Sequence, residues 1–386
     1  MTRAAARLLT WVARATVDRA AAGTPPIDAM ASDADWKAFL RLGLAHSMLP
    51  LSWRALERHV APLPVALATD LRSAWTANAS RNLRLTAELQ SILAILDTAG
   101  IRALAWKGPV LAQRAYGDLS ARQFFDLDVL IRRSELSQAS AVLANLGFQP
   151  EKQMTDAQRN TYVDHQGELE LVRSSDGVWL ELHTAVVPTY YSAGRSSDEL
   201  WQHAVRAPVA RAEVWTLDPV DDIEALCVHG SKHRWDRLAW ITDVALMARL
   251  LDEPAWHRLI DAARRHGTLR MVVIGFVLAV DVCGASLPVE VIRTLRADRT
   301  AVALAHQAHQ GLFDPRPRRT DALFFHARMR ERPGDRLRYL VNVAFRPSGA
   351  DWEGITLPRA LFPVYALTRP LRLAWKYGRR ALGRPS

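Results

Sequence analysis

The stretch from residue 101 to 131 constrains the fold most, because it interrupts a helical pattern that dominates the sequence before it. Residues 101–106 form a short apolar run typical of a buried strand. Gly108-Pro109 then favours a turn into a helix over 110–116. Residues 124–131 form a second strand-like run. A sheet with helices packed against it is therefore predicted here.

Helical patterns lie on both sides of this stretch. Residues 1–95 are rich in Ala, Leu and Arg, with apolar residues three and four positions apart, and the same periodicity returns after residue 218. Between these regions, alternating runs at 168–172 and 178–183 surround Ser175-Asp176-Gly177, which predicts a hairpin. Further helices are expected at 83–97, 134–146, 223–251, 255–266, 269–282, 289–311 and 320–331.

These patterns predict an α+β fold in which a small mixed sheet is flanked by N-terminal and C-terminal α-helical regions. The length of 386 residues favours two or three domains. The expected divisions are an N-terminal helical region at 1–95, an α/β core at 96–217, a helical domain at 218–345 and a Pro-rich basic tail at 346–386.

The charge is unevenly distributed. The chain has 50 Lys and Arg against 40 Asp and Glu, and residues 359–386 contain seven basic residues and no acid. Such an excess is typical of proteins that bind nucleic acid, anionic lipid or phosphate-bearing substrates, and high arginine usage alone also produces it. Trp375 and Tyr377, beside Lys376, would suit an interfacial helix. A solvated tail remains the favoured interpretation.

Other features indicate a cytoplasmic location. The longest apolar run, 271–280, is too short to span a bilayer. The N-terminus, interrupted by Arg7 and Arg14, reads as an amphipathic helix more readily than as a secretory signal. Cys227 and Cys283 are too few for a disulfide framework, which fits a reducing compartment.

Two aspartates lie in the second strand-like run. Asp126 and Asp128 are two positions apart, so on a strand they point to the same face. Neighbouring carboxylates repel each other, and a divalent cation between them relieves the repulsion. Oxygen ligands of this kind suit Mg²⁺ completed by phosphates and water. An Asp-x-Asp pair alone is more often structural or solvated.

The preceding turn adds weight to the aspartate pair. Lys107-Gly108 lies where a strand passes into a helix, and Gly108 allows a ligand to approach the backbone. A helix N-terminus with a nearby lysine favours phosphate. An ordinary strand-to-helix turn would look similar. The occurrence of Lys107-Gly108 and Asp-x-Asp within 22 residues favours the functional interpretation.

A third acid is needed if two metal ions are to support phosphoryl transfer. Glu181 is the candidate, because it shares one face of the second hairpin strand with Trp179 and His183. Glu168 and Glu170 on the partner strand are alternatives. His183 could orient an acid or contact substrate, although a lone strand histidine is more often simply hydrogen-bonded.

The combination of motifs resembles the uncharacterised bacterial nucleotidyltransferase family, a branch of the DNA polymerase β-like nucleotidyltransferase superfamily. The motifs that carry the resemblance are Ala105-Trp106-Lys107-Gly108, Arg122 before Asp126 and Asp128, Gly147-Phe148, Leu180-Glu181-Leu182-His183, His229-Gly230 with His233, Trp235, Trp240 and Asp243, and the Pro-rich tail. The resemblance covers about residues 85–375 and implies a nucleotidyltransferase core.

The resemblance also implies roles for particular residues. Asp126, Asp128 and Glu181 would bind Mg²⁺ or Mn²⁺, although the family's third acid is often aspartate. Lys107 and Gly108 take the place of a Gly-Ser that binds triphosphate in the wider superfamily, so the serine hydroxyl is absent. Arg122 would contact phosphate or brace its loop, and a salt bridge is an equally good interpretation.

The implied reaction is attack by an acceptor on the α-phosphorus of a nucleoside triphosphate (NTP), with release of pyrophosphate. The acceptor stays open: a small molecule, a sugar phosphate, a protein hydroxyl or a tRNA end. A second interpretation is a catalytically silent nucleotidyltransferase fold that acts as a binding or scaffold protein. The absent serine favours it, and the three acids argue against it.

A third interpretation is a metal-dependent phosphohydrolase that uses His229, His233 and Asp243. His229 and His233 are four residues apart, a spacing that can bind zinc, but Gly230 replaces the glutamate of His-Glu-x-x-His. A packing role for this cluster is the leading interpretation. The remaining candidates for phosphate or substrate contacts are Lys232, His233, His229 and Trp235.

Overall fold

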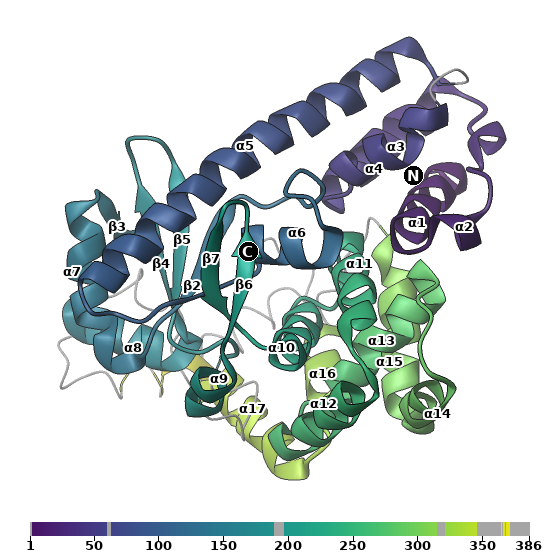
Figure 1. Cartoon of the computed structure of the whole chain (residues 1–386). Coiled ribbons are helices and arrows are strands. Elements are labelled where there is room, and N and C mark those ends of the chain that lie inside the picture. Colours follow the sequence, from purple (N-terminus) through teal and green to yellow (C-terminus); the bar gives the residue numbers. More distant parts are fainter. Residues whose placement is uncertain are drawn as a thin grey trace.

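The computed structural model describes residues 2–59, 63–188, 197–314, 321–345, 364, 366 and 368–370. A five-stranded mixed sheet lies among helices from both ends of the chain (Figure 1). This confirms the expected α+β fold with N-terminal and C-terminal helical regions. The domain limits at 95, 217 and 345 stay predictions. Most of the expected tail at 346–386 lies outside the described residues.

Short helices precede one long helix in the N-terminal region. Ser32 caps its helix in a capping box with Asp35, as Ser-x-x-Asp spacing favours. The long helix α5 covers the predicted 83–97 helix and begins well before it. The elements are α1 (Arg3–Val17), α2 (Arg19–Ala22), η1 (Ile27–Ala29), α3 (Asp33–Ala45), α4 (Leu49–Leu56), η2 (Glu57–His59) and α5 (Val65–Thr98).

The central region contains every strand of the described chain. Its larger sheet has the order β1-β2-β5-β4-β3; β2 and β5 run parallel, and the other pairs are antiparallel. The elements are β1 (Leu104–Trp106), α6 (Gly108–Tyr116), β2 (Asp126–Leu130), η3 (Arg133–Glu135), α7 (Leu136–Asn145), β3 (Phe148–Pro150), α8 (Asp156–Gln166), β4 (Glu168–Arg173), β5 (Val178–His183), α9 (Ser197–His203), β6 (Val205–Val209) and β7 (Ala212–Thr216).

The predicted hairpin at 168–183 is confirmed as β4–β5. The strand expected at 101–106 is shorter, and the helix expected at 134–146 begins with the 3₁₀ turn η3 before α7. The β6–β7 hairpin, which forms a second, two-stranded sheet, was not predicted individually. Its strands are only five residues long, and β6 contains Pro208, a residue that strand interiors disfavour.

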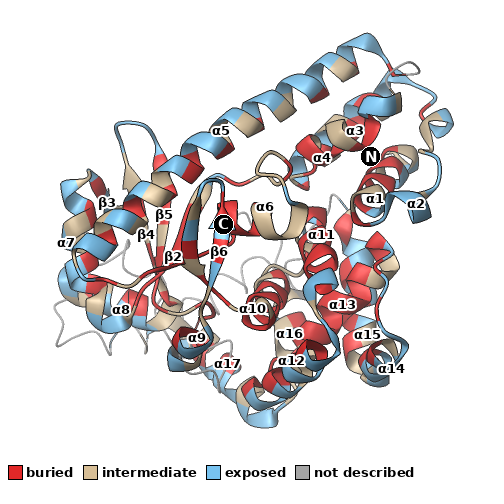
Figure 2. Cartoon of the chain, viewed as in Figure 1, coloured by how far each residue is buried: buried red, intermediate tan, exposed pale blue. Residues whose placement is uncertain are grey.

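The sheet separates two hydrophobic cores. Leu127 and Val129 of β2 pack with Leu89 and Ile92 of α5 on one side. Trp106 of β1 belongs to the other core, which the N-terminal and C-terminal helices share. Buried residues line both sides of the sheet (Figure 2). Because alternate strand residues face opposite sides, Asp126 and Asp128 point away from α5.

The C-terminal region is helical, as expected, with two breaks that the periodicity did not reveal. The single helix predicted at 223–251 is two helices, since the chain turns at Arg234 and Trp235, where φ is positive. The helix predicted at 289–311 is interrupted where Asp298 accepts hydrogen bonds from the backbone of the following helix. The elements are α10 (Pro219–Lys232), α11 (Leu238–Met247), η4 (Ala248–Leu250), α12 (Glu253–His266), α13 (Leu269–Cys283), α14 (Val289–Ala297), α15 (Arg299–Leu312), α16 (Asp321–Arg328) and α17 (Pro333–Phe345).

Apolar content in these helices is high, and α13 has a buried residue at most positions. Among the helices of the described ranges, none combines the length and hydropathy needed to cross a bilayer.

Candidate active site

The sheet register brings two of the predicted acids together. Asp128 on β2 lies opposite Glu181 on the parallel strand β5, and Asp126 lies opposite Trp179. Residues opposite each other share a face, so Asp126, Asp128 and Glu181 all project toward α10. Asp128 is buried, whereas Asp126, at the start of β2, and Glu181 are partly exposed.

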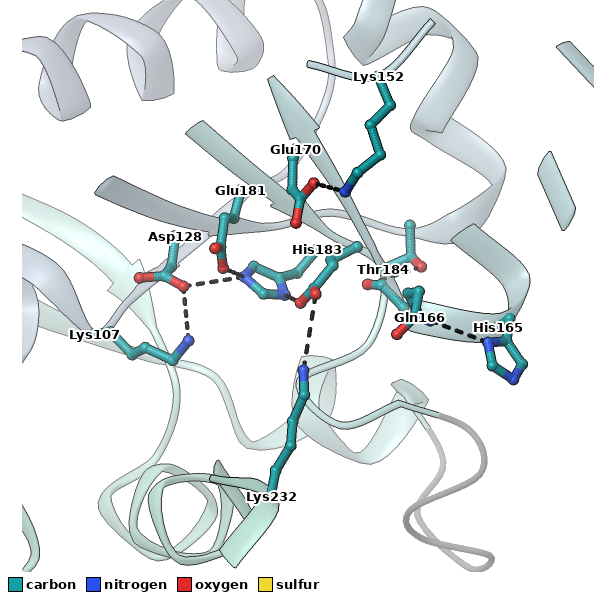
Figure 3. A network of polar contacts seen from close by, with 12 residues as sticks. Lys107, Asp128, Lys152, His165, Gln166, Glu170, Glu181, His183, Thr184 and Lys232 are labelled. Atoms are coloured by element: carbon teal, nitrogen blue, oxygen red, sulfur yellow. Dashed lines mark hydrogen bonds and ion pairs between the residues drawn. The ribbon is translucent and has the colours of Figure 1, made fainter. Parts of the chain in front are cut away.

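His183 completes a compact cluster with these acids (Figure 3). Its Nε2 lies 3.1 Å from Asp128 Oδ1 and 3.2 Å from Glu181 Oε2. Ligand-type atoms of Asp128, Glu181 and His183 all lie within 4.8 Å of one another, a spacing that could hold a metal ion. The histidine therefore fixes the separation of the two carboxylates.

Lys107 approaches the same cluster from the turn between β1 and α6. Its Nζ donates to Asp128 Oδ1 at 2.8 Å and lies 4.2 Å from the centre of the Trp106 ring. The backbone of Lys107 has φ 48°, and Gly108 follows with φ 37°. A Cβ on Gly108 would lie 3.7 Å from the carbonyl oxygen of Asp126, so this turn runs close to the start of β2.

Charges in the cluster shift one another's protonation. Burial lowers the pKa of Lys107, but the carboxylates of Asp128, Glu181 and Asp126 outweigh burial and raise it. Burial would raise the pKa of Asp128, yet Lys107 and His183 hold it below its usual range. Burial lowers the pKa of His183, and its bonds to Asp128 and Glu181 raise it to about 9.

Asp126 differs from its neighbours in its charge balance. Burial raises its pKa to about 6, and the negative charges of Asp128 and Glu181 contribute in the same direction. The pKa of Glu181 is lowered, since burial is outweighed by its hydrogen bond with His183. Of the three acids, Asp126 is therefore the one whose neighbours disfavour its charged form, whereas Lys107 and His183 favour the charged forms of Asp128 and Glu181.

The C-terminal end of α10 faces this part of the sheet. Lys232 Nζ lies 3.9 Å from Glu168 Oε1, and the other oxygen of Glu168 lies 3.6 Å from His183 Nδ1. Glu170 instead pairs with Lys152 at 2.6 Å. Of the three glutamates considered from the sequence, Glu181 is therefore the one beside Asp128 (Figure 3).

His229 and His233 lie on α10 and at its C-terminus, and contact Trp240. The ring centroids are 4.8 Å apart between the histidines, and 4.9 and 5.1 Å from Trp240. Burial, together with the charges of Lys232 and Lys107, lowers the pKa of His233 to about 4. The pKa of His229 is lowered for the same reasons. Both rings are neutral near pH 7.

The predicted phosphohydrolase centre does not form. Among the described residues, the metal-type group of three is Asp128, Glu181 and His183, and it excludes His229, His233 and Asp243. Asp243 instead accepts hydrogen bonds from Arg122 Nε, at 3.2 Å to each oxygen, and from Tyr116 at 2.7 Å. The carboxylate is committed to these partners, so this interpretation is wrong.

The same contacts decide between the interpretations of Arg122. Its side chain is largely buried and paired with Asp243, so it braces the loop before β2. A phosphate would have to compete with that carboxylate.

Replacing Tyr116 with phenylalanine tests how much this bracing contributes. A hydrogen bond to a buried charge contributes about 1.5–3 kcal/mol, so we expect Tyr116→Phe to lower the free energy of unfolding by that amount. Urea denaturation measures the loss. An unchanged midpoint would show that Arg122 alone satisfies Asp243.

Trp235, predicted as a possible substrate contact, lies in the core. It is fully buried, and its indole nitrogen donates to Ser231 Oγ at 3.3 Å. A Cβ on Gly230 would lie 2.5 Å from the ring, and one on Gly275 would lie 3.0 Å from it. The indole thus fills space left by two glycines, and its role is packing.

Sequence reasoning missed the residues that hold the loop before β2. Asn78 and Asn82 are buried on α5. Asn78 donates to the carbonyls of Ser120 and Arg122, and Asn82 donates to those of Leu119 and Arg122. Two asparagines four residues apart on the apolar side of an amphipathic helix were the available signal.

Residues 32–284 match the family described as "Uncharacterised nucleotidyltransferase". The match covers more than half of the chain, and the protein belongs to this family. No match was found among curated proteins. Among solved structures, the chain has similarity to the antibiotic-resistance factor ANT(2'')-Ia, whose solution structure is described as showing substrate-regulated conformation dynamics. That comparison has 13% identity and a TM-score of 0.35, and covers 47% of this chain and 92% of the other. A TM-score this low defines neither the fold nor the function.

Proposed function

We propose that this protein is a Mg²⁺-dependent nucleotidyltransferase that moves a nucleoside monophosphate from an NTP to an acceptor, with pyrophosphate released. The observation that carries the proposal is the register of β2 and β5, which places Asp128 beside Glu181 with Asp126 on the same face. Membership of the nucleotidyltransferase family supports it. Because NTPs are supplied in the cytoplasm, we expect the protein to act there.

The donor set fits a divalent cation. Asp126, Asp128 and Glu181 offer hard carboxylate oxygens, which Mg²⁺ and Mn²⁺ prefer. Burial and, after it, the carboxylates of Asp128 and Glu181 raise the pKa of Asp126, and a bound cation would favour its charged form. When bound, the metal would lower the pKa of the attacking group and neutralise charge on the phosphates.

Residues around the acids would position the triphosphate. Lys107 lies at the N-terminus of α6, so its ammonium and the helix backbone together offer positive charge to phosphate oxygens. This arrangement would replace the serine hydroxyl of the wider superfamily. Lys232 and His233 face the same space from α10, as an ammonium and a neutral imidazole.

His183 would act as a positioning residue. It is almost completely buried and joins Asp128 to Glu181 through one nitrogen. Because the two carboxylates are already held at a fixed separation, little reorganisation of the site would be needed when the substrate binds. His229 lies behind His233 in the ring cluster and would support it.

One observation favours the alternative that the protein is a catalytically silent nucleotidyltransferase fold. Lys107 already bonds Asp128 at 2.8 Å, so the ammonium could serve as a permanent counter-ion for the carboxylate. The two proposals differ in whether an NTP binds in a Mg²⁺-dependent way.

Calorimetry with each of the four NTPs distinguishes them. We expect one NTP to bind at least about tenfold more tightly with Mg²⁺ than with EDTA, because a metal held by the carboxylates would neutralise charge on the phosphates. The double variant Asp126→Asn/Glu181→Gln should lose this difference. Glu170→Gln is the matched control, since Glu170 lies on the same face but pairs with Lys152.

If no NTP binds, or the double variant and the control both bind like the wild type, the transferase proposal fails. A Mg²⁺-independent nucleotide affinity that survives in the double variant would instead support the silent binding protein.

A further inference from the structure

The helices α16 and α17 carry an unusual concentration of exposed apolar side chains. Phe324 is 70% exposed, Leu337 64%, Val341 47% and Phe345 46%. Leu337, Val341 and Phe345 are four residues apart, so they form one stripe along α17. Other side chains of these helices point inward, including the buried Phe325 and Tyr339. The two helices are therefore amphipathic, with an apolar side left outside.

Arginines border this stripe. Arg328, Arg332 and Arg338 are exposed on or between the two helices. Arg332 donates to the carbonyls of Arg264 and Arg265, so the C-terminal end of α12 adds its own exposed arginines here. Figure 1 shows α17 below the sheet, between α9 and α12. Exposed arginines therefore lie at the end of α16, between the two helices and on α17 itself.

The sequence concentrates basic charge in the same part of the chain. Residues 321–386 contain thirteen Arg and Lys against five Asp and Glu, a net charge of +8 out of +10 for the whole protein. Of this excess, +2 lies in residues 321–345, which include α16 and α17, and +6 lies in residues 346–386. A partner for this end of the molecule should be anionic.

We propose that the surface formed by Phe324, Leu337, Val341 and Phe345, the α16–α17 face, docks on an anionic lipid bilayer. Apolar side chains on one side of a helix insert at the boundary between headgroups and acyl chains, and flanking arginines pair with anionic headgroups. No helix of the described chain can span a bilayer, so the protein would lie on the surface.

The combination of charge and apolar area selects this occupant. RNA would satisfy the arginines but leave the aliphatic Leu337 and Val341 without a role. A second copy of the chain would cover the apolar stripe but would bring two sets of exposed arginines together. An anionic bilayer satisfies both features. This inference does not depend on the transferase proposal.

Vesicle sedimentation of the full chain tests the docking. With vesicles of phosphatidylglycerol and phosphatidylcholine, we expect binding at least about tenfold stronger than with phosphatidylcholine alone, and weaker in high salt. The variant Leu337→Glu/Val341→Glu should lose at least about tenfold of this binding, since two carboxylates replace inserted side chains. Both residues are exposed, so the fold should tolerate the changes.

The matched control is Val65→Glu/Leu83→Glu on α5, where the wild-type side chains are 83% and 60% exposed. It adds the same charge elsewhere and should bind vesicles like the wild type. The proposal is overturned if the wild type does not bind anionic vesicles, if the α17 variant binds as well as the control, or if a fluorescent single-stranded RNA binds and the vesicles do not.

Discussion

Replacing Asp128 with asparagine is expected to weaken Mg²⁺-dependent NTP binding by at least about 100-fold. Asparagine keeps the shape of the side chain but removes the negative charge that a divalent cation requires. The loss should be large because Asp128 is almost completely buried and contacts both Lys107 and His183. Calorimetry with the NTP that binds the wild type measures it.

Stability must be separated from binding in this experiment. Asp128→Asn leaves the ammonium of Lys107 buried without its anionic partner, which costs about 3–5 kcal/mol of folding free energy. The double variant Lys107→Met/Asp128→Asn removes both charges and should recover most of that stability. It should not recover NTP binding. Normal binding of Mg²⁺ and NTP by the double variant would show that Asp128 is not part of the binding site.

A second large effect is expected in the core beside α10. We expect Trp235→Ala to lower the free energy of unfolding by about 3–5 kcal/mol, because it empties a fully buried space. Gly230 and Gly275 cannot fill that space, since neither has a side chain and both lie against the indole. Urea denaturation measures the change.

Trp179→Ala serves as the control for this variant. Trp179 is 41% exposed, so truncation should cost clearly less stability. If Trp235→Ala unfolds at the same urea concentration as the wild type, the packing role is wrong. If it is stable but no longer binds NTP, the substrate-contact role considered from the sequence returns.

The acids of the candidate site could be predicted because short-range geometry places them. Asp126 and Asp128 share a face through the two-residue period of a strand, and Glu181 shares a face with His183 for the same reason. The Asp-Gly turn predicted the β4–β5 hairpin that carries Glu181. The parallel pairing of β2 with β5 could not be predicted from the sequence, because it joins residues more than fifty positions apart.

Partners from distant parts of the chain could not be predicted. Arg122 pairs with Asp243, which lies 121 residues later, so its bracing role depends on how the helical region packs. Asp243 was considered for the metal centre of the phosphohydrolase interpretation, because its contacts with Arg122 and Tyr116 are visible only in the fold. Trp235 was predicted as a possible substrate contact, because the helix break at a positive φ that places it in the core has no periodic signature.

The direction in which the Lys107 side chain points could also be determined only from the structure. A strand–Lys-Gly–helix sequence indicates a phosphate site, but the side chain bonds Asp128, on the strand that follows. The backbone conformation, with φ 48°, is one that residues other than glycine seldom adopt. Lys107 therefore links the proposed phosphate and metal positions, and its substitution should affect both.

Electron paramagnetic resonance of Mn²⁺ tests the central claim most directly, because it detects the divalent cation without knowledge of the acceptor. Relative to a mixture of Mn²⁺ and NTP without protein, the wild type is expected to change the Mn²⁺ spectrum further, and Asp126→Asn/Glu181→Gln should leave the spectrum of that mixture unchanged. Glu170→Gln should behave like the wild type. Equal Mn²⁺ binding by the wild type and the double variant, or none by either, would contradict a carboxylate metal site on this face of the sheet.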